Sequence, residues 1–468
     1  MRYRDKGRGI MRAEEGFIKR ASKYDSAVLI GTQRLPVMPL CVAFMAACVP
    51  ITPASLRAQG AAPHHAAADS SASRAHLGAM AVGLLTTANP ALLGRRYTEG
   101  YLTQPNVMGD VAFGPLRFTG TLNVEGYTLR RGELNAGMYG EGYADRRHPH
   151  TLVHEAMVSV ATPPRGGVRV TLAGGKGFTP YGTDDPMMRP FVKYPVNHHH
   201  AQIIERVLVM GALQVARGDR SVTIEQSWFN GDEPVGPFTG PQWSRVGDSR
   251  STRLTVAPMR SLEAQVSSAF VRSPGLTQGG AFDHWQRSGS VRYDVPNQRY
   301  VLVEVARTDE SLGRQRVFRF ASTLVESSMM HRGWALSARA ERTDRPESER
   351  LLDLFRIPTG HADFQLVGIT RWSIGTMQLA APGMGLPRLR GTHVTPFVEV
   401  ARATARPVRT PAVFVPAEFY GSATQWSLSL GARVHAGSMR RRMGRYVLPA
   451  AARAGMPSGD FPSHHLLP

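Results

Sequence analysis

Residues 426–434, Trp-Ser-Leu-Ser-Leu-Gly-Ala-Arg-Val, decide the fold class. Apolar side chains occupy every second position from Trp426 to Val434, with serine, glycine and arginine between them. Successive side chains of a strand point to opposite faces, so this period predicts a β-strand with one apolar and one polar face. The alternation recurs at 116–125, 168–172, 262–270, 301–305 and 334–341, and near 203–215, 222–229, 317–327, 364–372 and 394–403.

Two architectures accommodate such strands. In a soluble sandwich the apolar face packs on a second sheet, whereas in an outer-membrane barrel it meets lipid and the polar face lines a wet lumen. Arg and Glu at mid-strand and aromatic residues at segment ends favour the barrel. These aromatic residues are Tyr127, Trp228, Trp285, Tyr293, Trp372, Tyr420, Trp426 and Tyr446. At ~10 residues per strand plus connections, we predict an all-β, transmembrane, antiparallel up-and-down barrel of roughly 14–16 strands.

The amino-terminal part has the features of an export signal. A basic segment precedes the apolar run 37–49, which is too short to span a bilayer, and small residues follow near position 60. We predict a signal peptide with a long n-region over 1–60, with a lipoprotein signal at Cys48 as the alternative. Both cysteines of the chain then lie in the signal, which suits an exported protein. We further expect a flexible periplasmic lead at 61–96, the barrel at 97–448 and a disordered tail at 449–468.

The net charge is +20, from 56 Lys and Arg against 36 Asp and Glu. Residues 1–60 contribute ten basic and four acidic residues, so the remainder carries (56−10)−(36−4) = +14. Apart from Arg440, Arg441 and Arg442, the basic residues are scattered, so we expect no nucleic-acid partner. They are interpreted as solvated arginines, or alternatively as the lining of a cavity that favours anions.

Three segments resemble a known family: GMYGEGYADRRHPHT at 137–151, GKGFTPYGTDDP at 175–186 and FNGDEP at 229–234. They resemble uncharacterised, porin-like outer-membrane β-barrel proteins of Gram-negative-type bacteria, and the likeness runs across much of 97–446. The resemblance implies a barrel placed in the outer membrane. It implies neither an agreed substrate nor established catalytic residues.

The most irregular stretch is 174–195, which contains four Gly and four Pro and is too long for a turn. It forms either an extracellular loop or a constriction folded into the lumen. In the second case Asp184 and Asp185, facing Arg189 and Lys193, would set a transverse field that selects solutes by charge.

Six of the 16 histidines fall in two places: His148, His150 and His154, and then His198, His199 and His200. Alternate residues of a strand are ~7 Å apart, so imidazoles at 148 and 150 could reach one metal ion. The alternatives are a polar lumen lining for the first group and an exposed loop for the second. We expect no cofactor, with a transition metal as the alternative.

The sequence contains no Gly-x-Ser-x-Gly elbow and no Cys–His pair, so we expect no enzyme. The favoured function is an outer-membrane, porin-like channel for passive diffusion of small polar solutes or ions. A metal-handling barrel using His148, His150 and His154 is the alternative. The expected partners are outer-membrane lipid, the solutes and the barrel assembly machinery.

Overall fold

The computed structural model describes residues 74–90, 94, 96–128, 151–192, 194–196, 198, 204–232, 236, 238–348, 366–387, 391–437 and 442–447. Internal contacts divide the chain into Met1–Pro50 and Ile51–Pro468, and all described residues lie in the second unit. The predicted signal peptide at 1–60 and the predicted tail at 449–468 lie outside the described residues.

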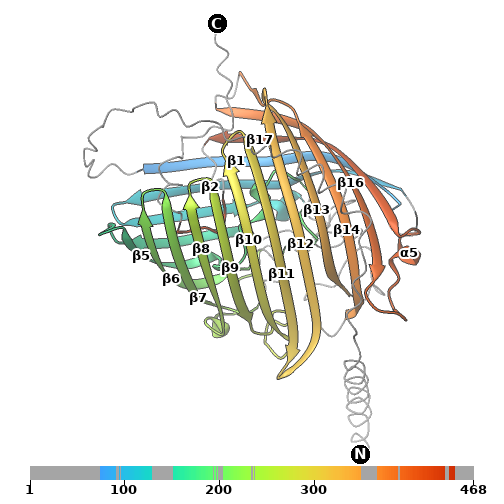
Figure 1. Cartoon of the computed structure of the whole chain (residues 1–468), viewed down its shortest axis with the longest axis horizontal. Coiled ribbons are helices and arrows are strands. Elements are labelled where there is room, and N and C mark those ends of the chain that lie inside the picture. The colour runs from blue at the N-terminus through green and yellow to red at the C-terminus, as the bar shows by residue number, and fades with distance from the viewer. Residues whose placement is uncertain are drawn as a thin grey trace, which may run out of the picture. The chain divides into compact units, whose positions relative to one another are not determined.

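Seventeen strands make up the sheet in the described part of the chain (Figure 1). They are β1 (Arg74–Asn89), β2 (Tyr97–Phe113), β3 (Leu116–Asn123), β4 (Val153–Ala161), β5 (Val168–Phe178), β6 (Glu205–Arg217), β7 (Arg220–Phe229), β8 (Ser249–Met259), β9 (Leu262–Val271), β10 (Asp283–Val295), β11 (Arg299–Leu312), β12 (Gln315–His331), β13 (Trp334–Ser348), β14 (Leu366–Ala380), β15 (Met384–Gly385), β16 (Thr392–Pro407) and β17 (Thr424–Gly437).

Antiparallel ladders join each long strand to the next one along the chain, and β17 returns to pair with β1. That last ladder runs from Gly78 opposite Gly437 to Asn89 opposite Trp426, so the sheet closes on itself. The two-residue β15 pairs with β16 within the β14–β16 connection, while β14 pairs directly with β16. Sixteen of the described strands therefore form a closed up-and-down barrel, which confirms the predicted fold class and strand number.

The two ends of the barrel differ in the length of most of their connections. At the end where β1 begins, most strands are joined by tight turns such as the one at Gly218, where φ is +58°. Glycine adopts such positive φ values without a steric penalty. At the other end, β5 and β6 are separated by 179–204, and β7 and β8 by 230–248. In barrels of this class the longer connections face the cell exterior.

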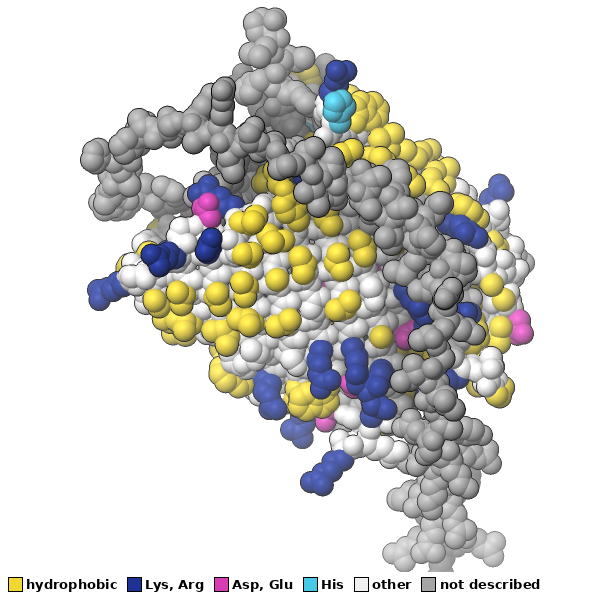
Figure 2. All heavy atoms as spheres, in the orientation of Figure 1, with side chains coloured by type: hydrophobic (Ala, Val, Ile, Leu, Met, Phe, Trp, Pro, Cys, Tyr) yellow, Lys and Arg dark blue, Asp and Glu magenta, His cyan; other side chains and the backbone are white. Residues whose placement is uncertain are grey.

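Apolar side chains cover the outer wall, as Figure 2 shows for one face. Leu172, Val305 and Leu430 are each more than half exposed, although each lies in the middle of a long strand. Their strand neighbours Thr171, Glu304 and Ser429 point inward and are almost fully buried. An exposed apolar wall on a closed sheet is solvated by lipid acyl chains. The fold and its wall therefore define a transmembrane β-barrel of the outer-membrane class.

The barrel begins earlier than predicted, because β1 starts at Arg74, inside the segment 61–96 expected to be a flexible lead. The period-two signal is weak there since both faces of β1 are apolar. Leu85 is exposed on the outer wall, whereas Val82 and Leu84 are buried inside against Val192 of the β5–β6 connection.

The predicted aromatic girdle is only partly correct. Trp228, Trp285 and Trp426 are exposed on the outer wall. Trp372 and Tyr420 instead lie in a buried cluster with Val196 and are fully shielded from solvent. The inner face of the barrel is apolar at this position, because inward-facing side chains of β14 and β16 pack against apolar residues of the β5–β6 connection.

The described helices are short and lie in the connections: α3 (Glu125–Thr128), α5 (Pro416–Phe419), and the 3-10 turns η2 (Pro186–Met188) and η3 (Trp243–Arg245). Within the described ranges, no helix is long and apolar enough to cross a membrane.

Candidate functional site

The described residues of the connection between β5 and β6 lie inside the barrel, and we call these residues (179–192, 194–196, 198 and 204) the inner loop. Gly182 donates its backbone N–H to Ser267 of β9, and Thr183 donates to Glu304 of β11. On the opposite wall, the backbone N–H of Val192 donates to Glu399 of β16. The inner loop therefore reaches across the lumen. Of the two alternatives for 174–195, the structure has the segment folded inward rather than projecting from the surface.

Local sequence explains why this segment leaves the strand pattern. Prolines at 180, 186, 190 and 195 lack the N–H that a continuous ladder needs. Asp185 caps η2, because its Oδ1 accepts a hydrogen bond from the backbone N–H of Met187 at 2.8 Å. The cap holds the chain in a compact turn at the point where the inner loop crosses the lumen.

Arg189 anchors the inner loop to the wall at β11 and β12. Its Nε lies 3.1 Å from Asp184 Oδ1, its Nη2 3.4 Å from Glu304 Oε2 and its Nη1 3.7 Å from Glu326 Oε1. These four side chains are at most 3% exposed. A guanidinium buried this deeply is stabilised by paired carboxylates and destabilised by desolvation, so removing one partner is costly.

Asp184 is paired with three guanidinium groups. Besides Arg189, it accepts from Arg292 Nη1 of β10 at 2.5 Å and from Arg442 Nε at 3.0 Å. The sequence predicts that Asp184 and Asp185 face Arg189 and Lys193 across a passage. Instead Asp184 and Arg189 contact each other and neutralise part of that field, while Lys193 lies outside the described residues.

A second segment enters the lumen after the last strand: residues 442–447, which we call the C-terminal segment. Arg442 donates to both carboxylate oxygens of Glu263 at 2.8 and 3.0 Å and to Thr183 O of the inner loop at 3.2 Å. Tyr446 Oη donates to Glu155 and accepts from the backbone N–H of Phe178, both at 3.0 Å. These contacts span the barrel interior from β9 to β4.

Arg253 of β8 links the two inserted segments. Its side chain is 1% exposed and forms an ion pair with Glu225 at 2.6 Å. The same guanidinium donates to Gly182 O in the inner loop and to Gly444 O in the C-terminal segment, each at 3.4 Å. One wall residue therefore positions both segments at once.

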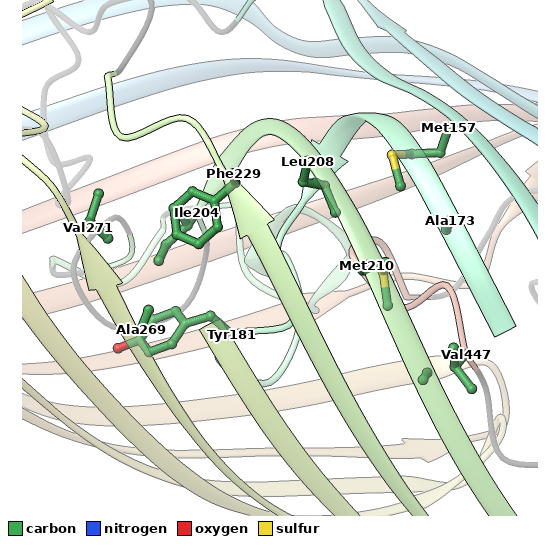
Figure 3. Close-up of a cluster of buried hydrophobic side chains, with 11 residues drawn as sticks. Met157, Ala173, Tyr181, Ile204, Leu208, Met210, Phe229, Ala269, Val271 and Val447 are labelled. Atoms are coloured by element: carbon green, nitrogen blue, oxygen red, sulfur yellow. The ribbon is translucent and has the colours of Figure 1, made fainter. Parts of the chain in front are cut away.

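An apolar cluster completes the junction. Tyr181 of the inner loop and Val447 of the C-terminal segment lie among apolar side chains from β4, β5, β6, β7 and β9, as the close-up in Figure 3 shows. A Cβ on Gly177 would collide with the Tyr446 hydroxyl, so this glycine permits the close approach of the C-terminal segment to β5.

The two described histidines of the predicted metal cluster have separate environments. His154 on β4 lies between Glu205, with Nδ1–Oε2 at 2.8 Å, and Asp185, with Nε2–Oδ2 at 3.4 Å. The ring of His198 contacts the Tyr194 ring at a centroid distance of 5.0 Å. His148, His150, His199 and His200 lie outside the described residues. Among the residues that are described, no group of three or more His, Cys, Asp or Glu is placed to hold a metal ion, and metal binding stays a prediction.

Comparisons with known proteins found solved structures of low similarity. No family model matches the chain, and no curated protein matches it. An anion-selective porin from Comamonas acidovorans is similar at 10% identity and a TM-score of 0.46, covering 78% of this chain and 100% of that one. OccK11 (OpdR) of Pseudomonas aeruginosa is 13% identical, with a TM-score of 0.36 and coverage of 78% and 96%. OccAB3 of Acinetobacter baumannii is 9% identical, with a TM-score of 0.36 and coverage of 77% and 99%. Because these scores are below 0.5, we draw the function from the geometry of this barrel.

The charge state of Asp184 gives a testable pH dependence. Burial alone would raise the pKa of its carboxyl, but Arg292, Arg189 and Arg442 outweigh burial and hold this pKa well below its ordinary value. The ionised carboxylate of Asp184 therefore stabilises the folded protein. This contribution is complete above the pKa of aspartate in the unfolded chain, about 3.9, and is lost as pH falls from there through the pKa of Asp184 in the folded protein. We expect the unfolding free-energy difference between wild type and Asp184→Asn to stay constant from pH 7 to about pH 5 and to shrink below about pH 4. A difference that had already vanished at pH 6 would contradict this assignment.

Proposed function

We propose that the protein is a passive outer-membrane channel whose lumen is narrowed by the inner loop and the C-terminal segment. The observation that carries the proposal is the junction at Asp184, where Arg189 of the inner loop, Arg292 of the wall and Arg442 of the C-terminal segment meet. A closed barrel of this strand number has room for a water-filled lumen. Inserted segments then set the width of the passage, and the charges along it set which solutes enter.

The proposed cargo is small and polar. Carboxylates and guanidinium groups alternate along the inner wall, for example Glu225 beside Arg253 and Glu326 beside Arg339. A wall of paired charges offers hydrogen-bond partners to ions and polar solutes without requiring a covalent step. The proposal therefore includes no enzymatic activity and no nucleic-acid ligand. It also includes insertion by the barrel assembly machinery.

The experiment is reconstitution of the folded protein in planar bilayers and in liposomes. We expect discrete conductance steps, and liposome swelling rates that fall as neutral sugars of increasing size are used, because the inserted segments limit the width of the passage. Bilayers that receive detergent or heat-unfolded protein are the controls. Correctly inserted barrels that show neither conductance nor swelling would contradict a channel.

A further inference from the structure

Outward-facing arginines gather around an aspartate on β10–β12. Asp309 of β11 pairs with Arg307 Nη2 at 2.8 Å, with Arg319 Nε at 2.6 Å and with Arg287 Nη1 at 3.9 Å. The arginine side chains are 40%, 40% and 58% exposed, so they lie on the outer wall rather than in the lumen. We call these four residues the first arginine cluster.

The same composition recurs on β13–β16. Asp344 of β13 accepts two hydrogen bonds from Arg371 of β14, at 2.6 and 3.0 Å. Arg406 of β16 lies directly opposite Arg371 in the ladder. Arg342 precedes Asp344 by two residues on the same face and interacts electrostatically with Asp344, Arg371 and Arg406. These four residues form the second arginine cluster.

Each cluster holds three guanidinium groups and one carboxylate, so each has a formal excess of 3−1 = +2. In both clusters two arginines face each other on neighbouring strands, Arg287 opposite Arg307 and Arg371 opposite Arg406. Directly opposed like charges destabilise a strand pair. The aspartate offsets only part of this repulsion, and an added anion between the arginines would offset the remainder.

Both clusters lie near strand ends, since Asp309 is three residues before the end of β11 and Asp344 is four residues before the end of β13. Asp309 is level with Trp285, which is opposite it in the ladder, and Trp285 is in turn opposite Phe270. Interfacial aromatic residues sit at the level of lipid headgroups. Charges on the lipid face are costly at mid-membrane and nearly neutral at the interface. Figure 2 shows basic side chains, with acidic ones among them, below the apolar surface of the barrel. This is the end with the longer connections, which faces the outer leaflet.

We propose that the two arginine clusters bind phosphate groups on the headgroups of outer-leaflet lipids. The planar guanidinium fork donates two parallel hydrogen bonds to a phosphate, and two such forks lie side by side in each cluster. The adjoining apolar wall accommodates the acyl chains of the same lipid. A lipid contacts the arginines and the apolar wall at the same time, whereas free phosphate contacts only the arginines. The clusters are therefore expected to prefer a lipid headgroup to free phosphate.

The test is native mass spectrometry of the full-length, folded protein in detergent micelles. The probes are lipid A carrying two phosphates, the same lipid with its phosphates removed, and inorganic phosphate. We expect two tightly bound molecules of the phosphorylated lipid. Arg307→Gln with Arg319→Gln removes one of them, and Arg371→Gln with Arg406→Gln removes the other, each with about a thirtyfold loss of affinity.

The matched control is Arg217→Gln with Arg299→Gln, two exposed arginines at the tight-turn end. The control should bind lipid as wild type does. Heat-modifiable migration on gels establishes that each variant is folded. Equal binding of the dephosphorylated lipid, equal loss in the control, or displacement by millimolar phosphate would overturn the proposal. A change of oligomeric state without a change in lipid binding would overturn it in favour of a contact with a second copy.

Discussion

Ending the chain after Gly437 should raise the single-channel conductance severalfold. Strand β17 remains complete in this variant, but the C-terminal segment is gone, and with it the ion pairs of Arg442 and Arg445 with Glu263. Because the lumen loses the backbone and side chains of 442–447, its narrowest section widens, and conductance rises with that section. Planar-bilayer recording under the conditions used for wild type measures the effect.

A chain that ends after Val447 is the matched control. It keeps every described contact of the C-terminal segment, including the hydrogen bond from Tyr446 to Glu155, and should conduct like wild type. Equal conductance of the two truncated chains would show that residues 442–447 do not narrow the passage. Heat-modifiable migration on gels establishes that both chains form the barrel.

Replacing Arg189 with methionine should destabilise the packed inner loop by about 3–5 kcal/mol. The substitution keeps much of the side-chain volume but leaves Asp184, Glu304 and Glu326 without the guanidinium that bridges them. Asp184 keeps Arg292 and Arg442, and Glu326 keeps Arg339, but the three desolvated carboxylates lose one shared counter-charge and repel each other more strongly. We expect a lower urea midpoint, protease cleavage within 179–204 and noisy conductance.

Arg260→Met is the control for removing an arginine from an ion pair. Arg260 and Asp219 are 64% and 53% exposed, so their pair contributes at most about 1 kcal/mol. Arg189→Lys should recover part of the lost stability because it restores the charge. If Arg189→Met were as stable as Arg260→Met, the inner loop would not depend on this bridge.

The alternating pattern is sufficient to predict the strands and their lipid-facing side. Leu428, Leu430 and Val434 lie on the outer wall, and Ser427 and Ser429 lie inside, as expected from 426–434. The pattern fails where both faces of a strand are apolar. It places β1 in a flexible lead and Trp372 in the outer girdle, and both placements are wrong because the inner loop packs apolar residues against these strands.

The site is only partly predictable from the sequence. The density of glycine and proline marks 174–195 as irregular, and the charges within it point to Asp184, Asp185 and Arg189. Their roles do not follow from the local pattern, because Asp184 contacts Arg189 directly and its other partners come from β10 and from the C-terminal segment. The pattern assigns Tyr446 of the C-terminal segment to the outer aromatic girdle, which is wrong, because Tyr446 hydrogen-bonds Glu155 inside the barrel. The segment's other signal is Arg442, at the end of the only run of three consecutive arginines in the chain.

By itself, the sequence determined the local alternation, and with it the strands, the apolar wall and the need for a closed sheet in lipid. Only the tertiary structure decided what fills the lumen and where the outer arginines gather. The physical reason is separation along the chain. Thr183 and Arg442 are 259 residues apart, and Arg189 and Glu304 are 115 apart. Closure of β1 on β17 brings such charges together, and their pairing depends on that closure rather than on any local pattern.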